Sequence, residues 1–307
     1  MTAHIRETMG LAADEQGELG METVGTIGAG TIGTGVAQAL AMAGNEVILV
    51  DVSEEKLDRS LREMRRGLRS LKLLGVTAEV PDPKEVLGRI TPTIELAKVA
   101  AASFVIENAT ENWAIKEAIY RELRTTCSPE TTFGVNTSAI PITKIASLMD
   151  RPDNVVGMHF MNPVPMKPMV EVIRGHHTSD QTVKRARDLV AGMDKQSIVV
   201  NDSPGFVTNR VMMLTVNEAI FLLHEGVAST PEDIDRLFKT CFGHKMGPLE
   251  TADLIGLDTV LYSIEMLYEN LNDDKYRPCP LLRKMVSANL LGQKSGEGFY
   301  KHFQAAA

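Results

Sequence analysis

A glycine-rich turn constrains the fold of this chain more than any other stretch. The segment TIGAGTIGTG, residues 26–35, places Gly28, Gly30 and Gly33 at the spacing G-x-G-x-x-G. A strand-like run precedes this turn, and the residues that follow it repeat apolar side chains at helical spacing. The run EVILVD, residues 46–51, then has the character of a buried parallel strand. Strand, glycine turn, helix and strand in this order predict a βαβ unit.

The same unit has the parts of a dinucleotide site. Glycines allow the backbone to approach a pyrophosphate, and a helix beginning at Thr31 and Ile32 offers N–H groups and partial positive charge. Asp51 stands 23 residues beyond Gly28, where a carboxylate accepts hydrogen bonds from ribose hydroxyls and repels the 2′-phosphate of NADP. We therefore predict an NAD site formed by Gly28, Gly30, Thr31, Ile32, Gly33 and Asp51. The alternative, a tight turn for close packing, leaves Asp51 unexplained.

Strand-like and helix-like runs alternate from residue 23 to about residue 202. This alternation predicts an α/β fold with a doubly wound, mostly parallel sheet of the Rossmann type over residues 23–204. Beyond a break at residues 203–205, apolar residues at helical spacing predict a second, all-helical domain over residues 205–303. A helical extension wrapped on the first domain is the alternative. Residues 1–22 carry five acidic residues against one arginine, and we expect a flexible acidic leader there.

The composition argues against several classes of protein. Among 307 residues, 44% are hydrophobic, but no run approaches the roughly 18 apolar residues of a membrane span, and the first residues lack the pattern of a signal peptide. We therefore expect a cytoplasmic protein without a membrane partner. The net charge of −8 argues against a nucleic-acid partner. Scattered Cys127, Cys241 and Cys279 indicate reduced thiols, and the side chains of adjacent His176 and His177 should diverge, so we predict no metal site.

Further motifs follow the glycine turn along the chain. They include ENWAIK, NTSAI, VVGMHFMNPVP, MVEVIRG, DSPGFVTNR, GPLETADLIGLD and GQKSGEGFY. With these blocks, the chain from Val24 to Tyr300 resembles the 3-hydroxyacyl-CoA dehydrogenase family, especially its 3-hydroxybutyryl-CoA branch. The resemblance implies an NAD-binding first domain, a helical second domain that commonly mediates homodimers, and oxidation or reduction at C3 of an acyl thioester.

The resemblance also implies the catalytic residues. His159 in MHFMNP matches the catalytic histidine of the family and Glu171 in VEVI its carboxylate partner, and both are expected at neighbouring strand ends. An imidazole takes the hydroxyl proton while hydride leaves for nicotinamide, and the carboxylate fixes its tautomer. Ser138 and Asn209 match polar residues around the reacting carbon. Taken alone, His159 could be a core histidine, Ser138 a helix cap and Asn209 a polar residue in a first helical turn.

The segment TENWAIK, residues 110–116, carries two further implied contacts. Glu111 and Lys116 match family positions that contact the cofactor. Either residue could instead be an ordinary surface charge on a helix that runs through this segment.

Three departures from the family pattern fall on the substrate side. Ala139 stands where the family has a second serine, MKPM at residues 166–169 moves a lysine and adds a proline, and residues 70–83 are apolar where a KGK-like sequence is expected to reach CoA. A basic run lies on the helix that leads into this stretch and comprises Arg62, Arg65, Arg66, Arg69 and Lys72. These features together suggest an acyl carrier protein, typically acidic, as an alternative to CoA. The other interpretation is a solvated helix face whose arginines pair with Glu63 and its neighbours.

We therefore expect an NAD-dependent 3-hydroxyacyl-thioester dehydrogenase, whose substrate is an acyl group on CoA or on a carrier protein. A dehydrogenase of free short hydroxy acids would use the same Ser138, His159 and Asn209 and is the first alternative. The second is an NAD-binding protein without turnover, against which the intact site residues argue.

Overall fold

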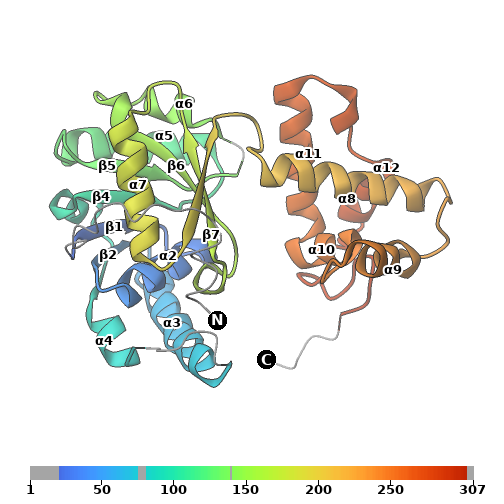
Figure 1. Cartoon of the computed structure of the whole chain (residues 1–307), viewed down its shortest axis with the longest axis horizontal. Helices are drawn as coiled ribbons and strands as arrows, with labels where there is room; N and C mark the ends of the chain where they lie inside the picture. The colour runs from blue at the N-terminus through green and yellow to red at the C-terminus, as the bar shows by residue number, and fades with distance from the viewer. Residues whose placement is uncertain (1–20, 75–80, 139, 303–307) are drawn as a thin grey trace, which may run out of the picture.

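An eight-stranded sheet forms the first part of the molecule (Figure 1). The computed structural model describes residues 21–74, 81–138 and 140–302. The order of the strands across the sheet is β3-β2-β1-β4-β5-β6-β7-β8. The strands are β1 (Thr23–Ile27), β2 (Glu46–Val50), β3 (Ile90–Thr93), β4 (Phe104–Glu107), β5 (Thr132–Val135), β6 (Val155–Phe160), β7 (Met169–Arg174) and β8 (Gln196–Asn201).

The pairing of the strands places the ligand edge of the sheet. All neighbours are parallel except β6 and β7, which are antiparallel. The order of the first six strands is that of a dinucleotide-binding fold, in which the ligand lies at the carboxyl ends of the strands where the order reverses. Here the reversal falls between β1 and β4. The predicted doubly wound, mostly parallel sheet is confirmed.

Helices cover both faces of the sheet, because successive side chains of a strand point to opposite sides. One face packs on α2, α3, α4 and α7, and the other on α5, α6 and the 3₁₀ helix η1 (Figure 1). Helix α3 buries Leu57, Met64 and Leu68 at helical spacing and leaves its arginines exposed. The helices are α2 (Thr31–Met42), α3 (Glu54–Leu74), α4 (Pro83–Gly88), η1 (Leu96–Ala101), α5 (Trp113–Thr126), α6 (Ile142–Ala146) and α7 (Asp180–Gly192).

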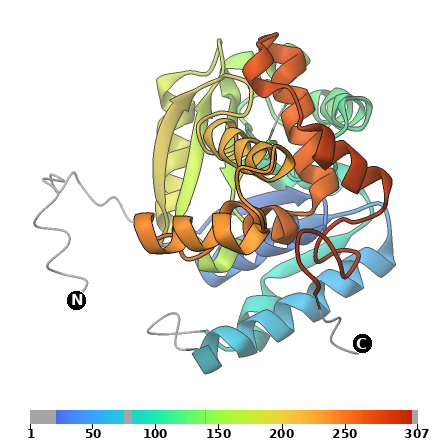
Figure 2. The same cartoon turned by 90° about the vertical axis from the view of Figure 1, so that its right-hand side faces the viewer.

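A helical domain follows the last strand and lies beside the sheet (Figures 1 and 2). Its own apolar core includes Val216, Leu249 and Ile264. Local signals set its boundaries: the Thr230 side chain caps α9, and that helix ends at Gly243, whose φ of 71° suits a residue without a side chain. The helices are α8 (Thr208–His224), α9 (Pro231–Phe242), α10 (Pro248–Ile255), α11 (Leu257–Leu271), η4 (Asp274–Tyr276) and α12 (Pro280–Ser287).

The expected leader, residues 1–22, lies outside the described residues except for Met21 and Glu22. Glu22 does not belong to such a leader, because its carboxylate accepts hydrogen bonds from Ser103 and Arg185 at the edge of the sheet domain. The boundary at residue 22 was therefore wrong for this residue. Ala139 and the tip at residues 75–80 also lie outside the described residues.

Several of the remaining expectations concern cysteine, histidine and hydropathy. All three cysteines are free thiols. The prediction that His176 and His177 diverge was wrong, since their rings meet edge to face with centroids 4.7 Å apart. No cluster of three or more residues suited to holding a metal ion occurs within residues 21–74, 81–138 and 140–302. In the same ranges, no helix has the length and apolar character needed to cross a membrane.

Candidate active site

A side chain would have space at one glycine of the turn and no space at the other two. Gly28 has a φ of 94°, and a Cβ atom there would lie 2.7 Å from the Asn108 carbonyl oxygen. A Cβ atom on Gly33 would lie 1.8 Å from the Gly28 oxygen. Gly30 caps α2, and a Cβ atom on it would meet nothing within 4 Å. The open side of the turn therefore lies at Gly30, at the N-terminus of a helix, where an anionic pyrophosphate is favoured.

Asp51 follows β2 directly beside this turn. Its Oδ2 atom accepts a hydrogen bond of 2.8 Å from the Ala29 N–H group, and its Oδ1 atom accepts one of 2.8 Å from Val52. The Lys56 ammonium group lies 3.5 Å from Oδ1. A carboxylate oxygen has further acceptor capacity, so Asp51 suits the ribose hydroxyls of NAD. Turn, helix terminus and carboxylate together fit this cofactor.

His159 and Glu171 form a buried pair on neighbouring strands. They are register partners of antiparallel β6 and β7, and the His159 Nδ1 atom lies 2.8 Å from Glu171 Oε2. Both residues are 5% exposed. The prediction that both lie at strand ends was wrong for Glu171, because the strand reversal pairs His159 with the third of the six residues of β7. The pairing brings the two side chains to the same face of the sheet.

Ser138 lies at the other nitrogen of the imidazole. Its Oγ atom is 3.1 Å from His159 Nε2. Because Nδ1 faces a carboxylate, the hydrogen of the neutral ring is assigned to Nδ1, and Nε2 is then an acceptor for the Ser138 hydroxyl. Ser138 is not a helix cap, since the following helix α6 has Pro141 at its cap position. His159 Nε2 and the Ser138 hydroxyl group therefore lie side by side.

Glu171 is held by four hydrogen-bond donors. Besides His159, the Thr208 hydroxyl donates to Oε2 over 2.7 Å, and the N–H groups of Val207 and Thr208 donate to Oε1 over 3.2 and 3.0 Å. Burial raises the pKa of Glu171, but hydrogen bonds from His159 and Thr208 outweigh burial and leave this pKa below its ordinary value. The residue is therefore an anion beside the imidazole at neutral pH.

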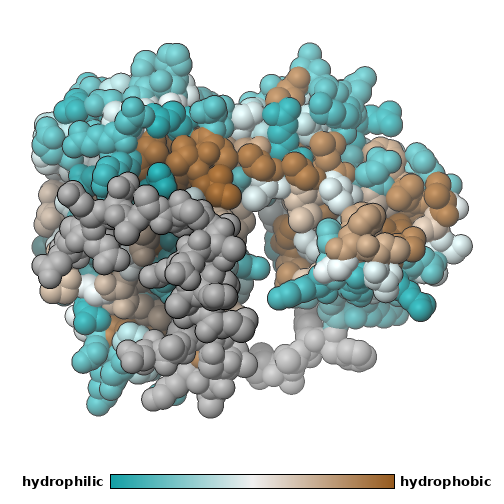
Figure 3. All heavy atoms as spheres, viewed as in Figure 1, coloured by the Kyte–Doolittle hydropathy of each residue, from teal (hydrophilic) through white to brown (hydrophobic). Residues whose placement is uncertain are grey.

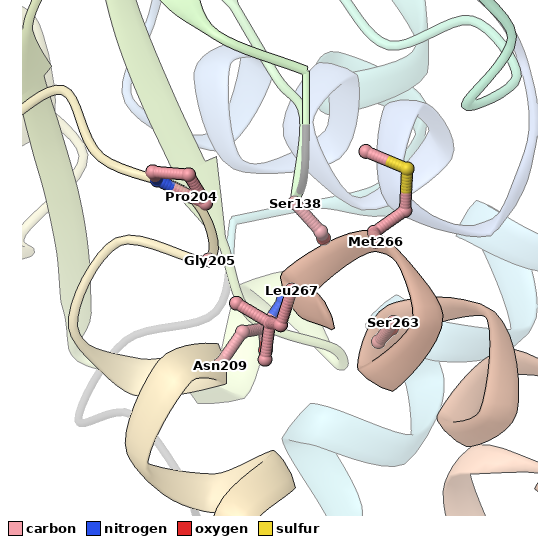
Figure 4. Close-up of a pocket in the computed structure, with 7 residues that line it drawn as sticks. All are labelled: Ser138, Pro204, Gly205, Asn209, Ser263, Met266 and Leu267. Carbon is pink, nitrogen blue, oxygen red and sulfur yellow. The ribbon is translucent and has the colours of Figure 1, made fainter. Parts of the chain in front are cut away.

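A small cavity opens next to Ser138 (Figure 4). Asn209 of the first turn of α8 lines it, as do Ser263, Met266 and Leu267 of α11. Its volume of about 10 Å³ is room for roughly one water molecule. Ser138 and Asn209, which the sequence predicted to act around the same carbon, therefore meet at one cavity between the two domains.

Glu111 lies in the loop before α5 rather than on that helix. Its Oε1 atom accepts hydrogen bonds from the Thr137 hydroxyl and from the Ile140 N–H group. Its carbonyl oxygen accepts one from the Tyr262 hydroxyl of α11 over 3.4 Å. Glu111 thus holds the segment that carries Ser138.

Comparisons with known proteins agree with this geometry. Sequence models of 3-hydroxyacyl-CoA dehydrogenase match the chain, the NAD binding domain at residues 23–203 and the C-terminal domain at residues 205–302. A probable 3-hydroxybutyryl-CoA dehydrogenase of Deinococcus radiodurans is 47% identical over 278 residues, which are 91% of this chain and 99% of that protein. The chain belongs to the 3-hydroxyacyl-CoA dehydrogenase family.

Other members of the 3-hydroxyacyl-CoA dehydrogenase family agree in sequence and in structure. A probable 3-hydroxybutyryl-CoA dehydrogenase of Bacillus subtilis is 46% identical over 275 residues, 90% of this chain and 95% of that protein. The crystal structure of (S)-3-hydroxybutyryl-CoA dehydrogenase from Ralstonia eutropha matches with a TM-score of 0.87 and 41% identity, covering 92% of this chain and all of that one. The predicted family, and NAD as its cofactor, are confirmed.

Lys116 of this family member is completely buried on α5. Its ammonium group lies 2.8 Å from both carboxylate oxygens of Glu107 and donates to the Asn136 carbonyl over 3.1 Å. Burial raises the pKa of Glu107 despite this pairing. The alternative of a surface charge was therefore wrong for Lys116, and its contact with the cofactor stays a prediction, because protein encloses its ammonium group here.

A second, larger cavity of this dehydrogenase lies between α2, α3 and the β6–β7 loop. It has a volume of about 200 Å³ and is lined mainly by the residues Thr34, Gly35, Gln38, Glu63, Gly67, Ser70, Asn162, Val164 and Met166. The Lys195 ammonium group holds this loop by donating to the carbonyls of Val164 and Lys167 over 2.7 and 2.9 Å. We call this space the α2–α3 cavity.

Sequence reasoning about this family member missed Glu107, Lys195 and Thr208. Thr208 stood within the quoted motif FVTNR, next to Asn209, but no periodicity indicated that its hydroxyl reaches a strand 37 residues earlier. Lys195 is a single lysine in the turn between α7 and β8, and a lysine in a turn usually is a solvated charge. These contacts are long-range, and local patterns do not encode them.

Proposed function

We propose that this chain interconverts 3-hydroxyacyl-CoA and 3-oxoacyl-CoA with NAD, and that His159 is the general acid and base. The observation that carries the proposal is the buried pair of His159 and Glu171, whose second imidazole nitrogen faces Ser138 at 3.1 Å. An imidazole with one nitrogen fixed by a carboxylate and the other directed at a hydroxyl group is arranged for proton transfer.

Each residue of the site has its own role in the oxidation. The substrate hydroxyl on C3 loses its proton to His159 Nε2, and the imidazolium that results is stabilised by Glu171. The glycine turn and Asp51 would hold NAD, which when bound would supply the acceptor for the hydride that leaves C3. Ser138 and Asn209 hydrogen-bond the substrate oxygens and hold C3 in place. In the reverse direction His159 returns the proton to the oxygen as hydride reaches C3.

Loss of the base should separate turnover from cofactor binding. His159→Ala is expected to lower kcat/KM for acetoacetyl-CoA by about 10²- to 10⁴-fold, because general acid and base catalysis contributes that much. NADH binding, measured by fluorescence, should be unchanged. His176→Ala, at an exposed position, is the matched control and should retain activity. Full turnover in His159→Ala would refute the assigned base.

The exposed arginines of α3 bear on which carrier brings the acyl group. Arg62, Arg65, Arg66 and Arg69 are exposed, and Glu63 pairs with Arg59. The side chain of Lys72 lies outside the described residues. We propose that this arginine face binds the anionic part of the carrier at the mouth of the α2–α3 cavity. CoA is the carrier indicated by the names of the relatives, and an acidic carrier protein is the alternative.

One comparison decides between the two carriers. The same acetoacetyl group is offered on CoA and on an acyl carrier protein, to the natural chain and to Arg62→Glu/Arg66→Glu. A charge reversal on the binding face should raise KM for the carrier that is used and leave kcat nearly unchanged. Arg121→Glu on α5 is the control at another exposed site. A free short hydroxy acid turned over faster than either thioester would favour the alternative activity.

We also propose that two copies of the chain associate. Support comes from an apolar band that runs from the edge strand β8 onto α8 (Figure 3). Its exposed members are Ile198, Val199, Val207, Val211 and Met212. An edge strand with unpaired backbone groups beside exposed apolar side chains is a surface that a second copy covers.

A further inference from the structure

We propose that Thr208 is a positioning residue that sets the strength with which Glu171 holds the imidazolium of His159. The inference rests on the proposed function of His159. Thr208 is not among the described residues that line the cavity beside Ser138. It acts through the one carboxylate oxygen that both residues use.

The geometry makes the two donors competitors. The Thr208 hydroxyl lies 2.7 Å and His159 Nδ1 2.8 Å from the same Glu171 Oε2 atom. A hydrogen bond from the hydroxyl stabilises the carboxylate and reduces the negative charge available to the imidazole. The hydroxyl therefore weakens the attraction between Glu171 and a protonated His159.

The backbone fixes the threonine in this position. Val207 caps α8 without a side-chain hydrogen bond, and the first N–H groups of the helix are satisfied by Glu171 Oε1 instead. Glu171 thus serves as the cap of a helix that belongs to the other domain. Because Thr208 is the first residue of that helix, its hydroxyl is carried to Oε2 with little freedom.

Charged groups on the surrounding elements are directed to other partners. Arg210 of α8 donates hydrogen bonds to Tyr276 and Ser203. The Lys144 ammonium group of α6 lies over the Trp113 ring. The Asp202 carboxylate accepts a hydrogen bond from the Thr143 N–H group. Glu111 is bound by Thr137 and Ile140, and Glu265 of α11 pairs with Arg283. Among the residues described, the Glu171 carboxylate accepts hydrogen bonds from His159, from the hydroxyl and N–H groups of Thr208 and from the Val207 N–H group.

The test compares three substitutions of Thr208. Thr208→Val keeps the shape of the side chain and removes the hydroxyl, Thr208→Ser keeps the hydroxyl, and Thr208→Ala guards against a folding defect of the valine variant. Without the hydroxyl, Glu171 should hold the imidazolium more strongly. The His159 titration, followed by NMR of the labelled ring, should then move upward by about half a pH unit in Thr208→Val and Thr208→Ala. Thr208→Ser should titrate like the natural chain.

The kinetic profile gives the second readout. In the oxidation direction the acidic limb of kcat/KM should move to higher pH by the same amount, because the base must be unprotonated. An unchanged titration in both hydroxyl-free variants, or a uniform loss of activity without a shift, would overturn the inference. A titration that shifts while the kinetic limb stays in place would instead overturn the assignment of His159 as the base.

Discussion

The glycines of the first turn differ in what surrounds them, and the difference assigns them separate tasks. Gly33 has no room for a side chain, since a Cβ atom would lie 1.8 Å from a backbone oxygen. Gly30 has ordinary backbone angles, φ −73° and ψ −174°, and open space where a Cβ atom would lie. The chain folds without needing a glycine at residue 30. We propose that the pyrophosphate of NAD is what requires it.

This contrast predicts different outcomes for two alanine variants. Gly30→Ala should keep the melting temperature of the natural chain and bind NADH at least roughly tenfold more weakly, because the methyl group occupies the space of the ligand. Gly33→Ala should lower the melting temperature as well, because backbone must shift. Thermal unfolding and NADH titration of both variants check this. Equal affinity for NADH in Gly30→Ala and the natural chain would contradict the assignment of this turn.

At the scale of elements, the loop between β6 and β7 is clamped from two sides. Val164 packs so closely on α2 that a Cβ atom on Gly35 would lie 2.8 Å from it. On the other side, buried Lys195 donates to two carbonyls of the loop. Burial holds the pKa of Lys195 below its ordinary value. The clamp fixes one wall of the α2–α3 cavity.

Removing the clamp should act on the substrate more than on the cofactor. Lys195→Met keeps the length of the side chain and loses both hydrogen bonds, each worth about 1.5–3 kcal/mol for a charged donor. We expect KM for acetoacetyl-CoA to rise roughly tenfold, with KM for NADH nearly unchanged. Lys184→Met, at an exposed lysine paired with Asp188, is the control. A Lys195→Met enzyme with both KM values intact would show that the loop needs no anchor.

Elements were more predictable from the sequence than their mutual contacts. The period of apolar residues is a local property, and it predicted α2, β2, α8 and the mostly parallel character of the sheet correctly. The pairing of His159 with Glu171 depends on the antiparallel return of β7, which no local period specifies. Lys116 was expected at the surface or at the cofactor, because the sequence does not show that its ammonium group pairs with Glu107 at the end of β4.

At the scale of the whole molecule, the apolar band crosses from one domain to the other (Figure 3). Val207 and Val211, which are 53% and 61% exposed, share one face of α8 and continue the exposed edge of β8. A surface that joins both domains would hold them in register when a second copy covers it. We therefore expect the proposed association to stabilise the contact between the two domains near Asn209.

The band predicts an effect on molecular mass. The natural chain should behave as a dimer by light scattering at micromolar concentration, and Val211→Glu should shift it toward the monomer, because a charge would be buried without a partner. Ile94→Glu, at an exposed apolar residue after β3, should leave the mass unchanged. A natural chain that is monomeric at this concentration would contradict the proposed association.

The carboxylate of Glu171 belongs to two contacts at once. Three of its four donors come from the start of α8, so one side chain of the sheet domain both contacts His159 and holds the first turn of a helix in the other domain. The two domains are therefore joined at the same carboxylate that we propose to stabilise the imidazolium.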